Sequence, residues 1–297
     1  MGLGEREEAA AQMRQAIADH PRRHEPRLWL GKLELHGGRL DSALATLREA
    51  MTLAPLNGET YHWLGIGLLR ADSLEAAQQA LERAVRLIPY HPRPQLTLAR
   101  VLERQGRSQD AEKRRNLYAR LLDLQTRVEE YEYRSEATPD DARLVSNLAT
   151  AYAQQRRLVK AEVKFREAIT LDPHYGRGFY GLGMVMLSQG RHDEATQILR
   201  RATLVEPSMV EGHNALGQAH LKAARYDSAI VAFQHALQLD PSAVPARSNL
   251  AIAYQALGQT ALARQAWHQV LAIDPDNKLA LGWLGQTPGT GNAAQAR

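Results

Sequence analysis

Proline recurs in this chain at a fixed interval, and that interval restricts the fold more than any other feature of the sequence. Pro21, Pro55 and Pro89 are 34 residues apart, and the same interval separates Pro139, Pro173, Pro207, Pro241 and Pro275. The gap from Pro89 to Pro139 is 50 residues, which is one period plus 16 extra residues. A fixed period of about 20 to 50 residues is typical of proteins built from stacked supersecondary units.

Other positions keep the same register. A leucine stands nine residues after each proline, with a small residue directly behind it: Leu30 and Gly31, Leu64 and Gly65, Leu98 and Ala99, Leu148 and Ala149, Leu182 and Gly183, Leu216 and Gly217, Leu250 and Ala251, Leu284 and Gly285. Thirteen residues beyond the leucine is an alanine in every complete unit: Ala43, Ala77, Ala111, Ala161, Ala195, Ala229 and Ala263. Small residues let two helices approach closely, and proline ends the second helix. Each unit is therefore predicted to be two antiparallel helices. The leucine fills their seam, and a bulky residue of the second helix (Phe165, Phe233, Trp267) packs towards the next unit.

This pattern resembles the tetratricopeptide repeat family over nearly the whole chain. The 34-residue period, the leucine with its small neighbour, the alanine and the terminal proline stand where that family has them, as do the aromatic residues Tyr152 and Tyr254. The resemblance implies an all-α, right-handed superhelical solenoid of helix-turn-helix repeats, with the first helix of each repeat lining a concave face.

The register predicts five segments. Residues 1–21 form a half-repeat with only the second helix, 22–138 a block of three repeats, 139–275 a block of four, 276–286 a capping half-repeat and 287–297 a disordered tail. The helix from Glu7 to His20 carries Ala9, Met13 and Ala16 in the packing positions but lacks a first helix. We expect that an upstream segment has been removed, or that another chain covers this end in a homo- or hetero-oligomer.

The 16 extra residues predict that the second helix of the third repeat is extended, over about residues 110–134. Five apolar residues on it step by four and three: Leu117, Leu121, Leu124, Val128 and Tyr131. Such a stripe is coiled-coil-like. It either packs on the neighbouring helices of the same chain or forms a seam for a partner or a second copy.

Composition and motifs argue against catalysis, cofactors and metal. The chain has no cysteine, and its 11 histidines are not spaced as metal ligands. Gly176, Gly178 and Gly181 match a dinucleotide fingerprint, but a helix and not a strand precedes them. The net charge of only +4 disfavours nucleic acid as a partner. There is no apolar run of membrane-spanning length and no export signal, and the compartment stays open. Arginine outnumbers lysine 31 to 6, which is typical of a GC-rich bacterial genome.

Recognition residues are expected on the first helices, towards the concave side. The candidates are Arg93, Arg100, Arg104, Arg143, Asn147, Arg177, Tyr180, Asn214 and Asn249. Arginine pairs bidentately with carboxylates, so the arginines could form a strip that binds acidic side chains or a free C-terminal carboxylate. Alternatively, they form a solvated face with local partners such as Glu103. Only Asn147 and Arg177 match the five-residue carboxylate clamp of some family members, because Leu96, Arg100 and Gly181 depart from it.

The sequence as a whole favours a scaffold or adaptor that is not an enzyme and that binds a protein or peptide partner in its groove. The alternative is a structural or assembly subunit of a larger complex, which contacts its partners through the ends of the array and the extended helix.

Overall fold

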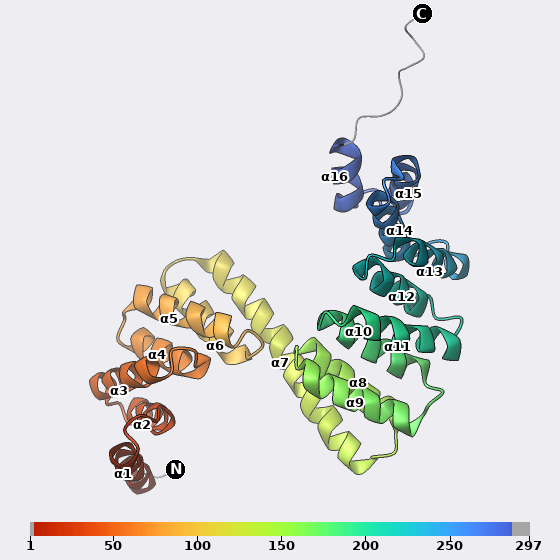
Figure 1. Ribbon diagram of the computed structural model, residues 1–297. Coiled ribbons are helices and arrows are strands. Elements are labelled where there is room, and N and C mark those ends of the chain that lie inside the picture. The colour runs from red at the N-terminus through yellow and green to blue at the C-terminus, as the bar shows by residue number, and fades with distance from the viewer. Residues whose placement is uncertain (1–2, 287–297) are drawn as a thin grey trace, which may run out of the picture. The chain divides into compact units, whose positions relative to one another are not determined.

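The computed structural model describes residues 3–286, and all regular secondary structure in that range is helical (Figure 1). The helices are α1 (Leu3–Asp19), α2 (Glu25–His36), α3 (Leu40–Leu53), α4 (Gly58–Arg70), α5 (Leu74–Leu87), α6 (Pro92–Arg104), α7 (Ser108–Ala137), α8 (Ala142–Gln154), α9 (Leu158–Leu171), α10 (Gly176–Ser188), α11 (His192–Val205), α12 (Val210–Lys222), α13 (Tyr226–Leu239), α14 (Val244–Ala256), α15 (Thr260–Ile273) and α16 (Lys278–Gln286). The predicted all-α fold of helix-turn-helix units is confirmed. The predicted tail, 287–297, lies outside the described residues.

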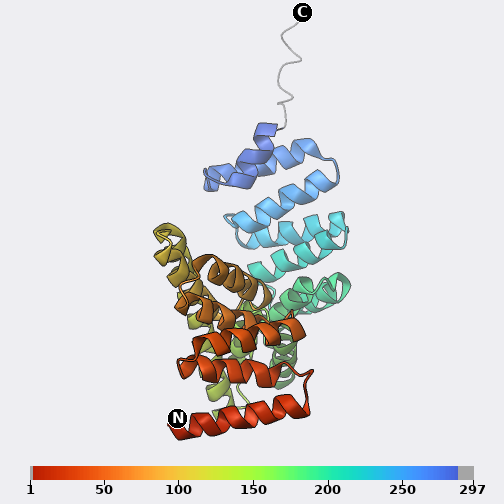
Figure 2. The same ribbon diagram turned by 90° about the vertical axis from the view of Figure 1, so that its left-hand side faces the viewer.

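The chain divides into two compact units, with the boundary after Thr126, inside α7. In each unit consecutive helices pack on one another, and Figure 2 shows the helices of the second unit stacked in chain order from α10 to α16. The repeat blocks expected to end at residue 138 and begin at residue 139 stay a prediction. No helix within residues 3–286 is both long enough and apolar enough to cross a membrane.

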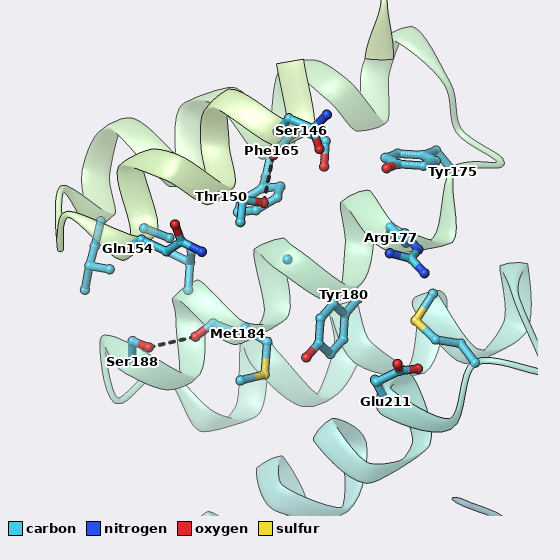
Figure 3. A pocket seen from close by; sticks show the side chains of 16 residues that line it. Ser146, Thr150, Gln154, Phe165, Tyr175, Arg177, Tyr180, Met184, Ser188 and Glu211 are labelled. Atoms are coloured by element: carbon cyan, nitrogen blue, oxygen red, sulfur yellow. Dashed lines mark hydrogen bonds between the residues drawn. The ribbon is translucent and has the colours of Figure 1, made fainter. Parts of the chain in front are cut away.

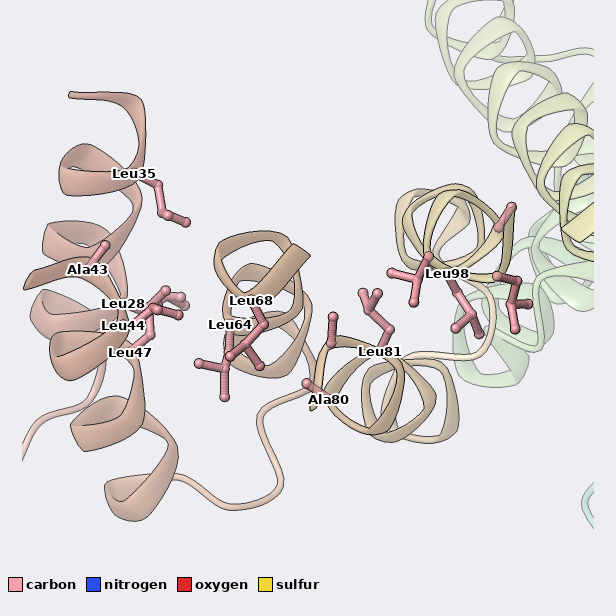
Figure 4. Close-up of a cluster of buried hydrophobic side chains, with 14 of the residues drawn as sticks. Leu28, Leu35, Ala43, Leu44, Leu47, Leu64, Leu68, Ala80, Leu81 and Leu98 are labelled. Carbon is pink, nitrogen blue, oxygen red and sulfur yellow. The ribbon is translucent and has the colours of Figure 1, made fainter. Parts of the chain in front are cut away.

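The seam within each helix pair is as tight as the repeated small residues indicate. All seven register alanines are 0% exposed, and the register leucine is buried in six of its eight occurrences. A Cβ atom added to Gly31, Gly65 or Gly183 would lie within 2.4–2.6 Å of the leucine Cγ on the facing helix. Figure 4 shows the resulting leucine cluster in the first unit. The glycines therefore set the distance between the paired helices.

The bulky residue of the second helix contacts the next helix pair or the first helix of its own pair. The ring of Phe165 lies against Gly181 in the next helix pair, as predicted. Phe233 also clusters with Leu250 of the next pair, but its ring contacts Gly217 of its own pair. Phe233 therefore packs within its own pair as well as towards the next one.

The turn between the two helices of a pair uses the left-handed backbone region at one repeated position. Positive φ angles of 55° to 77° occur at Gly38, Asp72, Gly106, Arg156, Gly190, Ala224 and Gly258. Glycine adopts this conformation without strain, whereas a residue with a Cβ does so at a cost. The three side-chain-bearing residues are held there by the flanking helices.

Polar side chains tie three of the repeats to the repeat before them. Arg70 donates to the carbonyl of Leu35 (2.5 Å) and Arg104 to that of Leu69 (3.0 Å). In the second unit the amide of Asn249 donates to Asn214 (2.9 Å). Each of these bonds joins residues 35 positions apart. They therefore connect consecutive repeats by polar contacts, as the leucine and alanine positions do by apolar ones.

Helix α7 is continuous over 30 residues, about 45 Å at 1.5 Å per residue. Of its apolar stripe, Leu121 and Val128 are buried, and Leu117, Leu124 and Tyr131 are half-buried. Val128 belongs to the core of the second unit, and Tyr131 packs against that core. The stripe is thus largely covered by its own chain.

Helix α1 packs on α2, with Ala10 buried and Ala9, Met13 and Ala16 half-buried. An ion pair between Glu7 and Arg39 (3.2 Å) also holds α1 to this unit. The packing positions expected from the sequence therefore face α2.

Candidate binding grooves

The second unit contains a cavity of about 590 Å³, formed mainly by the first helices of neighbouring pairs. Residues on α8 and α10 form its sides (Figure 3). Two residues of α9, one of α12 and the residues just before α10 and α12 complete it. On α10 the lining residues Arg177, Tyr180, Gly181, Met184 and Ser188 follow a spacing of three and four. Such residues share one face of a helix, so the repeat register presents one continuous stripe to the cavity.

The floor of this cavity is apolar because a glycine admits an aromatic ring. Phe165 and Val185 are buried, and Met184 is half-buried. Gly181 faces the ring of Phe165 so closely that a Cβ atom would lie 2.2 Å from Cε1. The cavity can therefore bind an apolar side chain of a ligand against an apolar surface that is already formed.

The polar residues of the cavity carry both signs of charge. Figure 3 shows Tyr175, Arg177 and Glu211 on one side of the cavity and Gln154 and Ser188 on the other. Burial raises the pKa of the Tyr180 hydroxyl, and the negative charge of Glu211 raises it further, whereas the positive charge of Arg177 lowers it. Tyr180 is thus a neutral hydrogen-bonding group at neutral pH.

Three of the sequence candidates meet in this cavity: Asn147, Arg177 and Tyr180. Arg143 is exposed in the first turn of α8, where its backbone N–H donates to Asp141. Asn214 and Asn249 are bonded to each other. They do not line the cavity, and their mutual bond gives them a structural partner.

The arginines predicted to form one strip are divided between the two units. Arg93, Arg100 and Arg104 belong to the first unit, and Arg143 and Arg177 to the second. Arg104 is a structural residue, because it bonds the Leu69 carbonyl and forms an ion pair with Asp72 (2.8 Å). Glu103, expected as a local partner of the strip, pairs instead with Arg115 (2.9 Å).

A second cavity, of about 500 Å³, lies wholly in the first unit. Arg93 lines it together with Trp29, Lys32, Glu59 and Trp63. The sequence pointed to Arg93 as a groove residue, but it gave no reason to include Glu59. An acidic residue in the first turn of a helix is usually explained by the helix dipole alone.

The second unit's cavity also contains residues that the register did not indicate, namely Tyr175, Thr150, Glu211 and Ser188. Tyr175 lies in the loop before α10, where no repeat position is defined. The Thr150 and Ser188 hydroxyls donate to the carbonyls of Ser146 and Met184 within their own helices, so these side chains offer the cavity mainly an acceptor.

Within residues 3–286, no group of three or more His, Asp or Glu side chains is placed to hold a metal ion. The glycines of the apparent dinucleotide fingerprint all lie in α10, where added Cβ atoms would meet Glu206, Ile169 and Phe165. Close helix packing therefore accounts for these three glycines.

Comparison with known proteins agrees with this architecture. A tetratricopeptide repeat family model matches residues 1–57, 96–176 and 180–244, and a second tetratricopeptide repeat model matches residues 220–286. No curated protein matches the chain.

Several solved structures are similar to it at low sequence identity. One chain of the APC/C Cut9–Hcn1 hetero-tetramer is 17% identical over 93% of this chain, with a TM-score of 0.46. The present chain spans only 51% of that chain. PilF of Pseudomonas aeruginosa is 17% identical over 77% of this chain and 97% of its own, with a TM-score of 0.46. YrrB, described as a TPR protein with an unusual peptide-binding site, is 17% identical over 80% of this chain and 97% of its own, with a TM-score of 0.43.

The family models together match most of the chain, and the register they describe is the one that packs the helices. The chain belongs to the tetratricopeptide repeat family.

Proposed function

We propose that the protein is an interaction scaffold whose second unit binds an extended peptide segment of a partner. The tetratricopeptide fold generally mediates protein–protein interactions. The observation that carries the proposal is the cavity of about 590 Å³, in which an apolar floor is combined with Asn147, Arg177 and Tyr180. Such a combination suits a chain that presents one apolar side chain between polar backbone groups.

Each lining group has a role in this proposal. An apolar side chain of the peptide packs over Phe165 and Met184, where contact removes apolar surface from water. The exposed amide of Asn147 can donate to and accept from a peptide backbone. Arg177 pairs with an acidic side chain or a terminal carboxylate, and Glu211 on the same side restricts where that acid can lie.

We further propose that the chain is not an enzyme. Two of the hydroxyls at this cavity, those of Thr150 and Ser188, donate to backbone carbonyls of their own helices. A hydroxyl nucleophile needs instead a general base that accepts its proton. The cavity is therefore suited to recognition.

An assembly subunit is the second candidate function, and the last helix favours it. Leu279 and Leu281 of α16 are 66% and 50% exposed, respectively. Exposed apolar side chains close together are typical of protein contact surfaces. In this alternative the end of the array carries the contact and the cavity is secondary.

The test is a selection of random peptides on the full chain by phage display, followed by calorimetric titration of a selected peptide. Arg177→Glu should weaken binding by about tenfold or more, the loss of one charge-assisted hydrogen bond. Glu211→Gln should strengthen binding of an acidic peptide. Arg201→Glu is the matched control, because Arg201 is exposed on α11 and does not line the cavity.

Peptides that bind all these variants equally would contradict groove recognition by the second unit. Loss of binding in a Leu279→Glu/Leu281→Glu variant, with the Arg177 variant unaffected, would establish the assembly alternative.

A further inference from the structure

The first unit contains a cluster of charged and aromatic side chains that the proposed function does not use. The Lys32 ammonium lies over the rings of Trp29 and Trp63, at 4.2 Å and 5.4 Å from their centroids. It also donates to Glu59 at 2.5 Å. The Lys32 side chain is only 9% exposed, so this cation is fixed within the wall of the cavity.

A pair of indoles with a carboxylate is a known arrangement for binding a cationic ligand. Here the chain's own lysine already occupies that place. The hydrogen bond from Lys32 keeps the pKa of Glu59 below its ordinary value, although burial alone would raise it. A cationic ligand would have to displace Lys32 from two rings and a carboxylate, whereas an anionic ligand would not.

The remaining charges favour an anion. With Lys32 and Glu59 neutralising each other, the cavity is left with Arg6 and Arg93. The positive charge of Arg93 also acts on His91. Burial is the largest cause of the lowered pKa of His91, and the charge of Arg93 lowers it further.

The aromatic walls supply the apolar part of the site. Trp29 is 56% exposed, which is unusual for so large an apolar side chain. Trp63 lies opposite the same ammonium and is half-buried, with the His36 ring 5.5 Å away. A volume of about 500 Å³ is enough for an aromatic side chain and a short length of backbone.

We propose that the first unit has a binding site of its own, between Trp29 and Trp63, for an acidic peptide segment that inserts an aromatic side chain. The aromatic ring stacks on the exposed indole of Trp29. Arg93 and Arg6 bind the flanking carboxylates, and Lys32 stays paired with Glu59 in the wall of the cavity. This site is separate in sequence and chemistry from the cavity of the second unit, which is lined by residues 146–211.

The four tryptophans of the chain make this site directly observable. Trp29 and Trp63 line the cavity of the first unit, whereas Trp267 and Trp283 are in the second unit. We suggest following the four indole N–H signals of the full-length protein by NMR, each assigned with a Trp→Phe variant. The probe is the acetylated and amidated tetrapeptide Asp-Phe-Asp-Glu, compared with Lys-Phe-Lys-Lys and Asp-Gly-Asp-Glu.

The expected result is a saturable shift of the Trp29 and Trp63 signals with Asp-Phe-Asp-Glu, and none at Trp267 and Trp283. Arg93→Glu should weaken this binding about tenfold, the equivalent of one charge-assisted hydrogen bond. Arg86→Glu is the matched control in the same unit, because Arg86 is exposed on α5 and does not line the cavity.

Three results would overturn the proposal. They are the absence of a saturable shift up to millimolar peptide, equal binding of the parent and the Arg93 variant, and tighter binding of Lys-Phe-Lys-Lys. The last would mean that Lys32 is a displaceable occupant of a cation site. Arg177→Glu should leave the response unchanged, so failure here and failure of the second unit's groove are distinguishable.

Discussion

Gly181 determines both the packing and the shape of the proposed peptide cavity, and its replacement by alanine is a sharp test. The added Cβ would lie 2.2 Å and 2.3 Å from Cε1 and Cζ of Phe165, whereas carbon atoms in contact are about 3.5–4.0 Å apart. The ring, 3% exposed, cannot move outward freely. Overpacking of this kind costs about 1–3 kcal/mol. A contact as short as this puts the cost near the upper end of that range. Alanine recovers up to about 1 kcal/mol through its helix propensity, so we expect a net destabilisation of about 1–2 kcal/mol.

Gly282→Ala is the matched control, because Gly282 also lies inside a helix but has nothing within 4 Å of its added Cβ. It should stabilise the protein by up to about 1 kcal/mol. Urea unfolding followed by circular dichroism compares the two variants with the parent. If Gly181→Ala is as stable as the parent or more stable, the argument from the Phe165 contact is wrong.

A second substitution should rescue the first. One repeat later, the positions of Phe165 and Gly181 are occupied by Leu199 and Ala215, both buried. Phe165→Leu combined with Gly181→Ala recreates that pair in the earlier repeat. The double variant should therefore be more stable than the sum of the two single changes indicates, with the coupling measured in a double-mutant cycle.

Other predictions concern single groups. Burial and neighbouring positive charges lower the pKa of His62 from 6.5 to about 4. As the pH falls, His62 therefore becomes protonated in the unfolded chain before it does in the folded one. The free energy of unfolding decreases by about 3 kcal/mol in all between pH 6.5 and pH 4. His62→Gln should show less of this loss in urea titrations at pH 7 and pH 4.5, and an equal loss in both proteins would refute the assignment. Ala224→Gly should raise stability by about 0.5 kcal/mol, because relief of the left-handed alanine exceeds the flexibility gained by the unfolded chain; a fall in the unfolding midpoint would count against it. Asp141→Ala removes the acceptor for the backbone N–H groups of Arg143 and Leu144 and should cost about 1 kcal/mol, and an unchanged melting temperature would show that water replaces the cap.

The sequence predicted the fold well because one short-range pattern determines it. The leucine, its small neighbour and the alanine are each in contact with the facing helix, so their spacing alone indicates the pairing. The turn position was not recognised, because only four of its seven residues are glycine. At Arg156 and Ala224 the neighbouring helices impose a backbone conformation that local preference opposes.

The candidate sites were predictable only in part, for a physical reason. The register shows which residues lie on the first helices, and three of the candidates, Asn147, Arg177 and Tyr180, line one cavity in the structure. Which way a long side chain turns depends on partners in other helices, which no spacing reveals. Arg104 turns to the carbonyl of Leu69, and Lys32 to Glu59.

The bonds between residues 35 positions apart have a consequence for how such a chain can change its length. Removal of a whole 34-residue segment within the first unit would keep such a bond for an arginine, because Arg70 and Arg104 occupy the same repeat position and each bonds a backbone carbonyl of the preceding repeat. The asparagine bond of the second unit would be lost, because Tyr180 stands one repeat before Asn214. A deletion of any other length between a donor and its acceptor would move the donor away from that acceptor. The 16 extra residues of α7 extend one helix past its turn and leave the register intact on both sides. A change of length by whole repeats therefore preserves the apolar core and the bonds to backbone carbonyls, but not every pair of polar side chains.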